Sequence, residues 1–96
     1  MVLSFGVCGD RIAGYAVWRI EDHGAYLRHF FVCRDHRRHG LGRAVFKLLC
    51  RDWFPKDRPI QLDAAIGNKA GIAFWHAIGF QDFGISMELK AGQAPT

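Results

Sequence analysis

The segment from Val32 to Arg43 constrains this chain most, because it joins an apolar, strand-like run to an amphipathic helix through a basic turn. The centre of the turn reads Arg37-Arg38-His39-Gly40-Leu41-Gly42. The first N–H groups of a helix have no intrahelical partners, and the helix dipole adds partial positive charge there. Glycines let the backbone approach an anion closely, and arginines add charge-assisted donors. The turn therefore predicts a phosphate-binding site.

The identity of the anion is narrowed by charge and by two missing patterns. Residues 28–58 carry nine Lys and Arg against three Asp, in a chain whose net charge is +4. Such an excess favours an anionic partner, which is a phosphorylated cofactor, a nucleic acid or an acidic surface. The dinucleotide pattern Gly-x-Gly-x-x-Gly fails because residue 45 is Val, and no Gly-Lys-Ser/Thr follows. Because the basic residues gather at a turn suited to one pyrophosphate, and no nucleic-acid reader motif is recognisable, we expect a cofactor and no nucleic-acid partner.

Hydrophobic periodicity divides the chain into seven elements. Runs rich in β-branched and aromatic residues predict five strands, at residues 2–8, 11–20, 25–33, 60–66 and 83–89. Apolar residues at 41, 44, 45, 48 and 49 predict an amphipathic helix that ends before Pro55. A second helix is predicted at residues 69–78, because Asn68 is a good N-cap and Gly79 a good C-cap.

The element order β-β-β-α-β-α-β predicts an α/β fold with one mixed sheet. Short turns make the first three strands an antiparallel meander, whereas the third and fourth flank a helix and should run parallel. We expect one domain at residues 1–90 and a frayed tail at residues 91–96. No apolar run is long enough to cross a membrane, and the N-terminus is unlike a signal peptide. We therefore expect a cytoplasmic protein without membrane contact.

Two blocks of this sequence resemble the GNAT superfamily of N-acetyltransferases. The first block in that family is an apolar strand ending in Val, then Gln/Arg-x-x-Gly-x-Gly/Ala and a helix; here the strand reaches Val32 and the turn is residues 37–42. The second is Asn-x-x-Ala/Gly-x-x-Phe-Tyr-x-x-x-Gly-Phe, which is similar to NKAGIAFWHAIGF at residues 68–80. The resemblance covers nearly all of the chain and implies a GNAT-like fold, whose two parallel central strands splay apart.

The resemblance also implies a site for acetyl-CoA. Amides around residues 38–43 would bind the pyrophosphate, Val32 and its strand neighbours would pair with the pantetheine arm, and Asn68 would hold that arm. The implied cofactor-binding residues are Phe31, Val32, Arg37, Arg38, His39, Gly40, Leu41, Gly42, Arg43, Asn68 and Phe74. The implied reaction moves an acetyl group from acetyl-CoA to the primary amine of a small molecule or peptide, by direct attack.

Two positions depart from the family at the chemical step. Trp75 stands where the family often has a Tyr that protonates the leaving thiolate, and Tyr26 stands where some members have a Glu base. We therefore name His29 as the candidate base and Tyr26 as the candidate acid. Since an indole N–H is a poor acid, a non-catalytic acyl-CoA-binding module stays open as the alternative function.

The chain is also shorter than most members, because it begins at what would be their second strand. One sheet face and one edge would then be uncovered, so we expect a homodimer or another partner to shield them. Cys33, His36 and His39 are spaced like part of a metal site. A zinc site needs a fourth ligand, and the neighbouring arginines would repel a cation, so we expect no metal.

Overall fold

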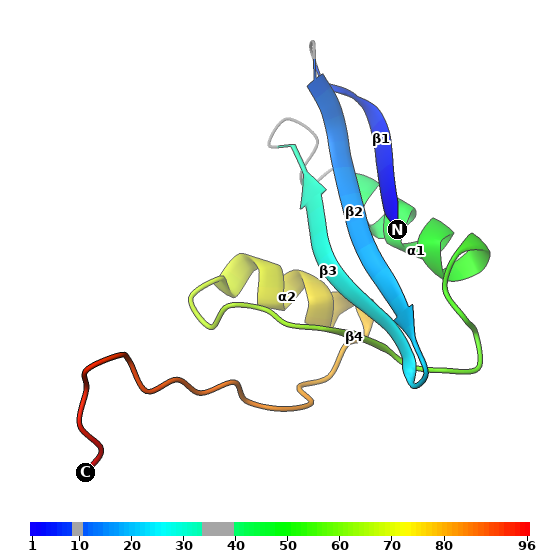
Figure 1. Ribbon diagram of the computed structural model, residues 1–96. Coiled ribbons are helices and arrows are strands. Elements are labelled where there is room, and N and C mark those ends of the chain that lie inside the picture. The colour runs from blue at the N-terminus through cyan, green and yellow to red at the C-terminus, as the bar shows by residue number, and fades with distance from the viewer. Residues whose placement is uncertain (9–10, 34–39) are drawn as a thin grey trace.

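A computed structural model describes residues 1–8, 11–33 and 40–96 of the chain. These residues form one four-stranded sheet in the order β1-β2-β3-β4, together with helices α1 and α2 (Figure 1). The bounds are Val2–Cys8 for β1, Arg11–Glu21 for β2, Gly24–Val32 for β3, Leu41–Asp52 for α1, Ile60–Leu62 for β4 and Lys69–Ile78 for α2. The predicted mixed α/β fold is confirmed: β1, β2 and β3 are an antiparallel meander, and β4 runs parallel to β3.

The helices cover one face of this sheet. In Figure 1, α1 lies behind the strands. Alternate residues of β2 and β3 point toward the helices, as the period of two in a strand requires. The core consists of Ala16, Trp18, Ala25, Leu27, Phe46, Leu49 and Phe54, and Trp75 and Phe80 pack against it. Each aromatic side chain buries a large apolar area, so this cluster holds the two helices to the sheet.

The turn between β2 and β3 determines where β4 joins the sheet. Gly24 has a φ of 145°, and a Cβ there would lie 2.0 Å from the Pro59 carbonyl oxygen. The Ala25 N–H donates to that same oxygen at 3.1 Å. Only glycine permits both the backbone angle and the close approach. Pro59 is thereby held against β3, and β4 begins with the next residue.

Pairing between the two parallel strands is short. Ala25 pairs with Ile60, Tyr26 with Gln61, and Leu27 with Leu62. Beyond Leu62 the chain leaves the sheet, although β3 continues to Val32. The fourth strand is therefore shorter than the predicted residues 60–66.

A β-bulge lies where this pairing ends. On β2, Val17 is opposite His29 and Trp18 is opposite Leu27, so Arg28 is the additional residue of β3. A bulge changes which face the following side chains point to. Leu27 and Phe30 accordingly both pack with the core, although they are three residues apart.

The predicted strand at residues 83–89 is wrong. Residues 80–90 have no helix or strand, and Figure 1 shows the C-terminal run leading away from the sheet. Phe83, Ile85 and Met87 are 88%, 81% and 86% exposed. The alternation of apolar residues indicates that the segment suits a strand, but a strand needs hydrogen-bonding partners. Here the segment is not paired with β4, which is the last strand of the sheet.

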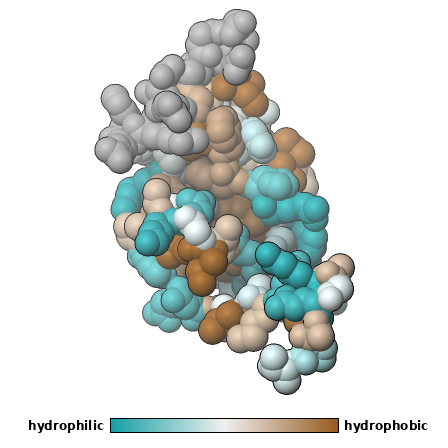
Figure 2. Space-filling view, turned by 90° about the vertical axis from the view of Figure 1, so that its left-hand side faces the viewer, coloured by the Kyte–Doolittle hydropathy of each residue, from teal (hydrophilic) through white to brown (hydrophobic). Residues whose placement is uncertain are grey.

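The side of the molecule nearest α2 has a mixed surface. Figure 2 faces this side and shows hydrophobic patches between hydrophilic residues. Among the residues that the structure describes, no helix is long and apolar enough to cross a membrane. Within the same residues, no group of His, Cys, Asp and Glu side chains is arranged to hold a metal ion.

Candidate active site

A cavity lies where β3 and β4 separate, and its volume is about 210 Å³. Because the strands stop pairing at Leu27 and Leu62, side chains rather than backbone bonds line the space that follows. The lining residues come from β3, from the last residue of β4 and the chain just after it, and from α2 and its N-cap. They are Leu27, Arg28, His29, Phe30, Leu62, Asp63, Ala64, Ala65, Asn68 and Trp75.

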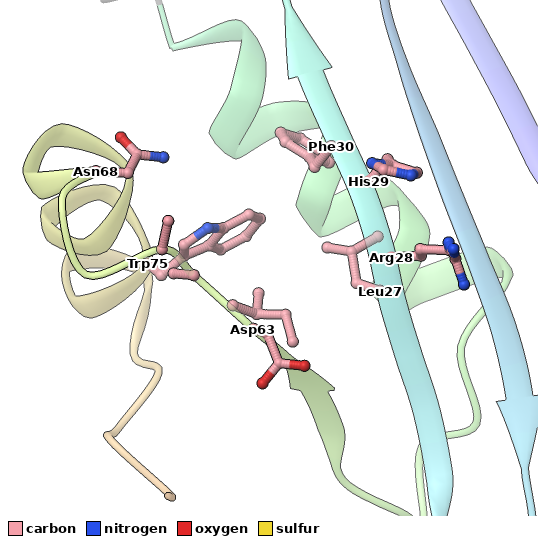
Figure 3. A pocket seen from close by; sticks show the side chains of 10 residues that line it. Leu27, Arg28, His29, Phe30, Asp63, Asn68 and Trp75 are labelled. Carbon is pink, nitrogen blue, oxygen red and sulfur yellow. The ribbon is translucent and has the colours of Figure 1, made fainter. Parts of the chain in front are cut away.

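One side of the cavity is apolar. In Figure 3, Trp75 extends from α2 toward Leu27 and Phe30 on β3. The Trp75 ring lies edge-on to Phe30 and Phe46, with centroid distances of 5.3 and 5.6 Å. Trp75 therefore packs in the aromatic core as well as lining the cavity. This packing explains in structural terms why a large aromatic residue stands at this position.

The other side of the cavity carries charge. Leu27 packs with the core, so its neighbour Tyr26 points to the opposite face of the sheet, and Asp63 directly follows the end of β4. The Tyr26 hydroxyl donates to Asp63 Oδ2 at 2.5 Å. This hydrogen bond, partial burial and the Asp63 charge raise the pKa of Tyr26, so its hydroxyl is protonated at neutral pH.

The two candidate catalytic residues both lie near this cavity. His29 lines it and is exposed, and in Figure 3 its ring lies on the β2 side of β3, with Arg28. Tyr26 is linked to the cavity through Asp63. Sequence reasoning did not place Asp63. A usable signal existed, since Asp63 directly follows the last paired residue of a parallel strand, where α/β folds gather functional groups.

The N-terminus of α1 has the features of an anion site. Gly40 is the N-cap, with φ 79° and ψ 0°, and it has no side chain to cap the helix. The first hydrogen bond of the helix runs from the Ala44 N–H to the Gly40 carbonyl at 3.0 Å. No acidic residue lies in the first turn, whereas Arg43 does. Of the residues predicted to bind pyrophosphate, Gly40, Leu41, Gly42 and Arg43 are in this turn, and Arg37, Arg38 and His39 lie outside the described residues.

Gly42 allows this turn to lie close to its neighbours. A Cβ on Gly42 would be 3.2 Å from the Phe74 ring and 3.6 Å from Val32 Cγ2. Phe74 in turn stacks on Phe30, with centroids 6.2 Å apart. The predicted cofactor-binding residues Val32, Gly42 and Phe74 are thus brought together. Phe31 precedes Val32 on β3 and stacks on Tyr15.

Asn68 caps α2 and also lines the cavity. Its side-chain Oδ1 accepts a hydrogen bond from the Gly71 N–H at 3.0 Å, and its carbonyl accepts one from the Ile72 N–H. The cap uses the side-chain oxygen of Asn68, which is a hydrogen-bond acceptor. The NH₂ group of the same side chain is a hydrogen-bond donor and takes no part in the cap. The predicted helix at residues 69–78 and its Asn68 and Gly79 caps are confirmed.

Comparison with known proteins gives a family. The model of the acetyltransferase (GNAT) family matches residues 3–80. A comparison with curated protein sequences found no match. Among solved structures, the chain is similar to a single-substitution mutant of the BH1408 protein from Bacillus halodurans, with 24% identity and a TM-score of 0.72 over 93% of this chain and 64% of that one.

Two acetyltransferase structures are also similar. For the ribosomal-protein-S18-alanine N-acetyltransferase from Escherichia coli the identity is 26% and the TM-score 0.65, over 81% of this chain and 51% of that one. For the ribosomal-protein-alanine N-acetyltransferase from Brucella melitensis biovar Abortus 2308 the identity is 18% and the TM-score 0.68, over 93% of this chain and 71% of that one. The chain thus spans about half to seven-tenths of these proteins. Since the family model matches well over half of the chain, the protein belongs to the GNAT acetyltransferase family.

Proposed function

We propose that this protein is an N-acetyltransferase that moves an acetyl group from acetyl-CoA to a primary amine. The observation that carries the proposal is the early end of β3–β4 pairing, which opens a cavity between the two parallel strands. In the proposed reaction the amine nitrogen attacks the thioester carbonyl directly. The C–N bond forms, the C–S bond breaks, the coenzyme leaves as a thiolate that takes a proton, and the amine loses one.

The residues present suit acetyl-CoA in shape and charge. A cavity of about 210 Å³ is below the usual range for a drug-sized ligand, so only the acyl end and the reacting amine would lie in it. The pyrophosphate would lie outside, at the N-terminus of α1, where the first-turn amides and Arg43 are donors. We assign Arg37, Arg38 and His39 to the same pyrophosphate from the family resemblance.

The pantetheine arm would run between these two places. By the family resemblance, Val32 and Phe31 would pair with it, and Phe74 would line its path. Asn68 lines the cavity with its carboxamide oxygen bound to the Gly71 N–H, and we assign its NH₂ group to a carbonyl of the arm. Such a role is compatible with the cap, because cap and ligand would use different atoms of the amide.

Proton transfer is assigned to His29 and Tyr26. His29 is the candidate base that takes the proton of the amine. Tyr26 is the candidate acid for the thiolate, and its raised pKa keeps it protonated at neutral pH. Its proton is directed at Asp63, so that hydrogen bond must break before the proton can reach the thiolate. General acid–base help is worth about 10²–10⁴-fold, so slow turnover is the expected outcome if Tyr26 contributes little.

We also propose that the chain forms a homodimer. The face of the sheet opposite the helices and the C-terminal run both expose apolar side chains, including Val2 at 68% and Phe83 at 88%. Burial of such surface drives association. Light scattering at micromolar concentration should give twice the monomer mass, and a well-folded monomer would contradict this part of the proposal.

The central test combines binding with turnover. Acetyl-CoA at a hundred times its Kd should stabilise the fold by about 2.7 kcal/mol, visible as a rise in melting temperature. A panel of primary amines is then screened for release of the CoA thiol. Stabilisation with turnover supports the proposal, and stabilisation without turnover supports the alternative of a non-catalytic acyl-CoA-binding module, which Trp75 and Tyr26 at the two departing positions favour. No stabilisation at millimolar acetyl-CoA refutes both.

A further inference from the structure

We infer that Asp63, held by Tyr26, binds the ammonium group of the acceptor, so that the acceptor is a cationic alkylamine. The bound ammonium loses one proton to water before its nitrogen attacks, and it loses a second proton to the candidate base His29 as the amide forms. This inference rests on the proposed function and extends it, because it assigns the acceptor side of the cavity to named residues. It also gives the Tyr26 side chain a positioning role that the family resemblance does not contain.

The first support is where the carboxylate lies. Asp63 follows Leu62, the last residue of β4 to pair with β3, and it lines the cavity where the strands separate. In Figure 3 the Asp63 carboxylate lies at one margin of the site, whereas Leu27, Phe30 and Trp75 form its apolar part. The cavity thus offers an apolar side for an acetyl group and a charged side for the group that receives it.

The second support is the electrostatics of Asp63. In the part of the chain that the structure describes, the ion pairs of Asp and Glu involve other residues, namely Glu21, Asp52, Asp57 and Asp82. The hydrogen bond that Asp63 accepts from the described residues comes from the neutral Tyr26 hydroxyl and uses Oδ2. Among the described residues, Asp63 therefore forms no ion pair, and the nearby Arg19 guanidinium lies on the Tyr26 ring. Arg28 also lines the cavity, and Figure 3 shows its side chain on the far side of β3 from Asp63.

The third support is the way in which Tyr26 is fixed. Tyr26 pairs with Gln61 across the parallel strands, and the Arg19 guanidinium lies 4.6 Å from the centre of its ring. The Tyr26 hydroxyl then reaches Asp63 at 2.5 Å, a length typical of a strong hydrogen bond to a charged acceptor. A bond of this kind orients the carboxylate before the ligand arrives, and pre-organisation is what makes binding favourable.

The direct experiment follows a probe amine without relying on turnover. Butylammonium chloride is titrated into the full chain, and backbone amide signals of residues 61–68 are followed by NMR. We expect saturable shifts in the wild type and binding weaker by about 10–100-fold in Asp63→Asn, since a hydrogen bond to a charged group contributes that much. Asp57→Asn is the matched control, because Asp57 is exposed and lies outside the cavity.

The KM values of a Tyr26 variant distinguish a role in positioning Asp63 from a role in the stability of the fold. Tyr26→Phe keeps the ring and removes the hydroxyl, so the KM for the amine should rise about 3–10-fold while the KM for acetyl-CoA and the melting temperature stay unchanged. An aniline acceptor, which is neutral at pH 7.5, should be unaffected by Asp63→Asn.

Three results would overturn the inference: no shift of residues 61–68 in the wild type, equal butylammonium affinity in Asp63→Asn, or equal losses for the cationic and neutral acceptors. Failure of the proposed function is seen separately, as an absent thermal shift with acetyl-CoA.

Discussion

The two helices of this protein begin in opposite ways. At α2, Asn68 caps the helix by accepting a hydrogen bond from the Gly71 N–H at 3.0 Å. At α1, the N-cap is Gly40, which has a left-handed backbone and no side chain to satisfy the first-turn amides. Neither helix has an acidic residue in its first turn. The difference teaches that a side chain of the N-cap residue completes the N-terminus of α2, whereas the N-cap of α1 leaves its first-turn amides open to the pyrophosphate that we propose.

The close packing at α1 is the first part of this comparison to test, and it has the largest expected effect. Gly42→Val would add a side chain where even a Cβ lies 3.2 Å from Phe74 and 3.6 Å from Val32. Overpacking of this kind costs about 1–3 kcal/mol. We therefore expect Gly42→Val to lower the free energy of unfolding, measured by urea denaturation, by about 2 kcal/mol. Gly67→Val is the control near α2, because nothing lies within 4 Å of a Cβ there. Equal stability of the two variants would mean that the α1 turn is not tightly packed.

The second prediction makes α1 begin more like α2. Gly40→Asp introduces an anion at the proposed pyrophosphate site, and Gly40→Asn introduces the same shape without charge. Both residues tolerate the φ of 79° better than other side chains, and a Cβ there has open space. We expect Gly40→Asp to bind acetyl-CoA about tenfold more weakly than Gly40→Asn, which corresponds to about 1.4 kcal/mol.

Salt dependence gives this second prediction its control. Exposed charges are screened over about 8–10 Å at physiological ionic strength. The difference between Gly40→Asp and Gly40→Asn, measured by calorimetry, should therefore shrink as NaCl is raised. If the two variants bind acetyl-CoA equally well at low salt, the open N-terminus of α1 does not hold the pyrophosphate.

The same two helix starts show what could be predicted from sequence. The bounds of α2 follow from its own residues, because Asn68 and Gly79 act locally, and they were predicted correctly. The segment at residues 83–89 was predicted as a strand and is not one, because its pairing depends on an edge elsewhere in the chain. Asp63 could not be placed for the same reason. Its contact with Tyr26 spans 37 residues and depends on the register of β3 against β4.

The smallest effect is expected at Asn68, where the cap and the proposed ligand contact meet in one side chain. Asn68→Ala removes the acceptor for the Gly71 N–H and should lower the free energy of unfolding by about 1 kcal/mol. Asn68→Asp keeps that acceptor and removes the NH₂ donor, so it should retain the stability of the wild type. Its acetyl-CoA affinity should nonetheless fall by about 3–10-fold, because a donor to the pantetheine carbonyl is lost. Urea denaturation measures the first quantity and calorimetry the second. If Asn68→Asp binds acetyl-CoA with wild-type affinity, Asn68 serves only to cap α2. Of the two helix N-termini, only that of α1 would then contact the cofactor.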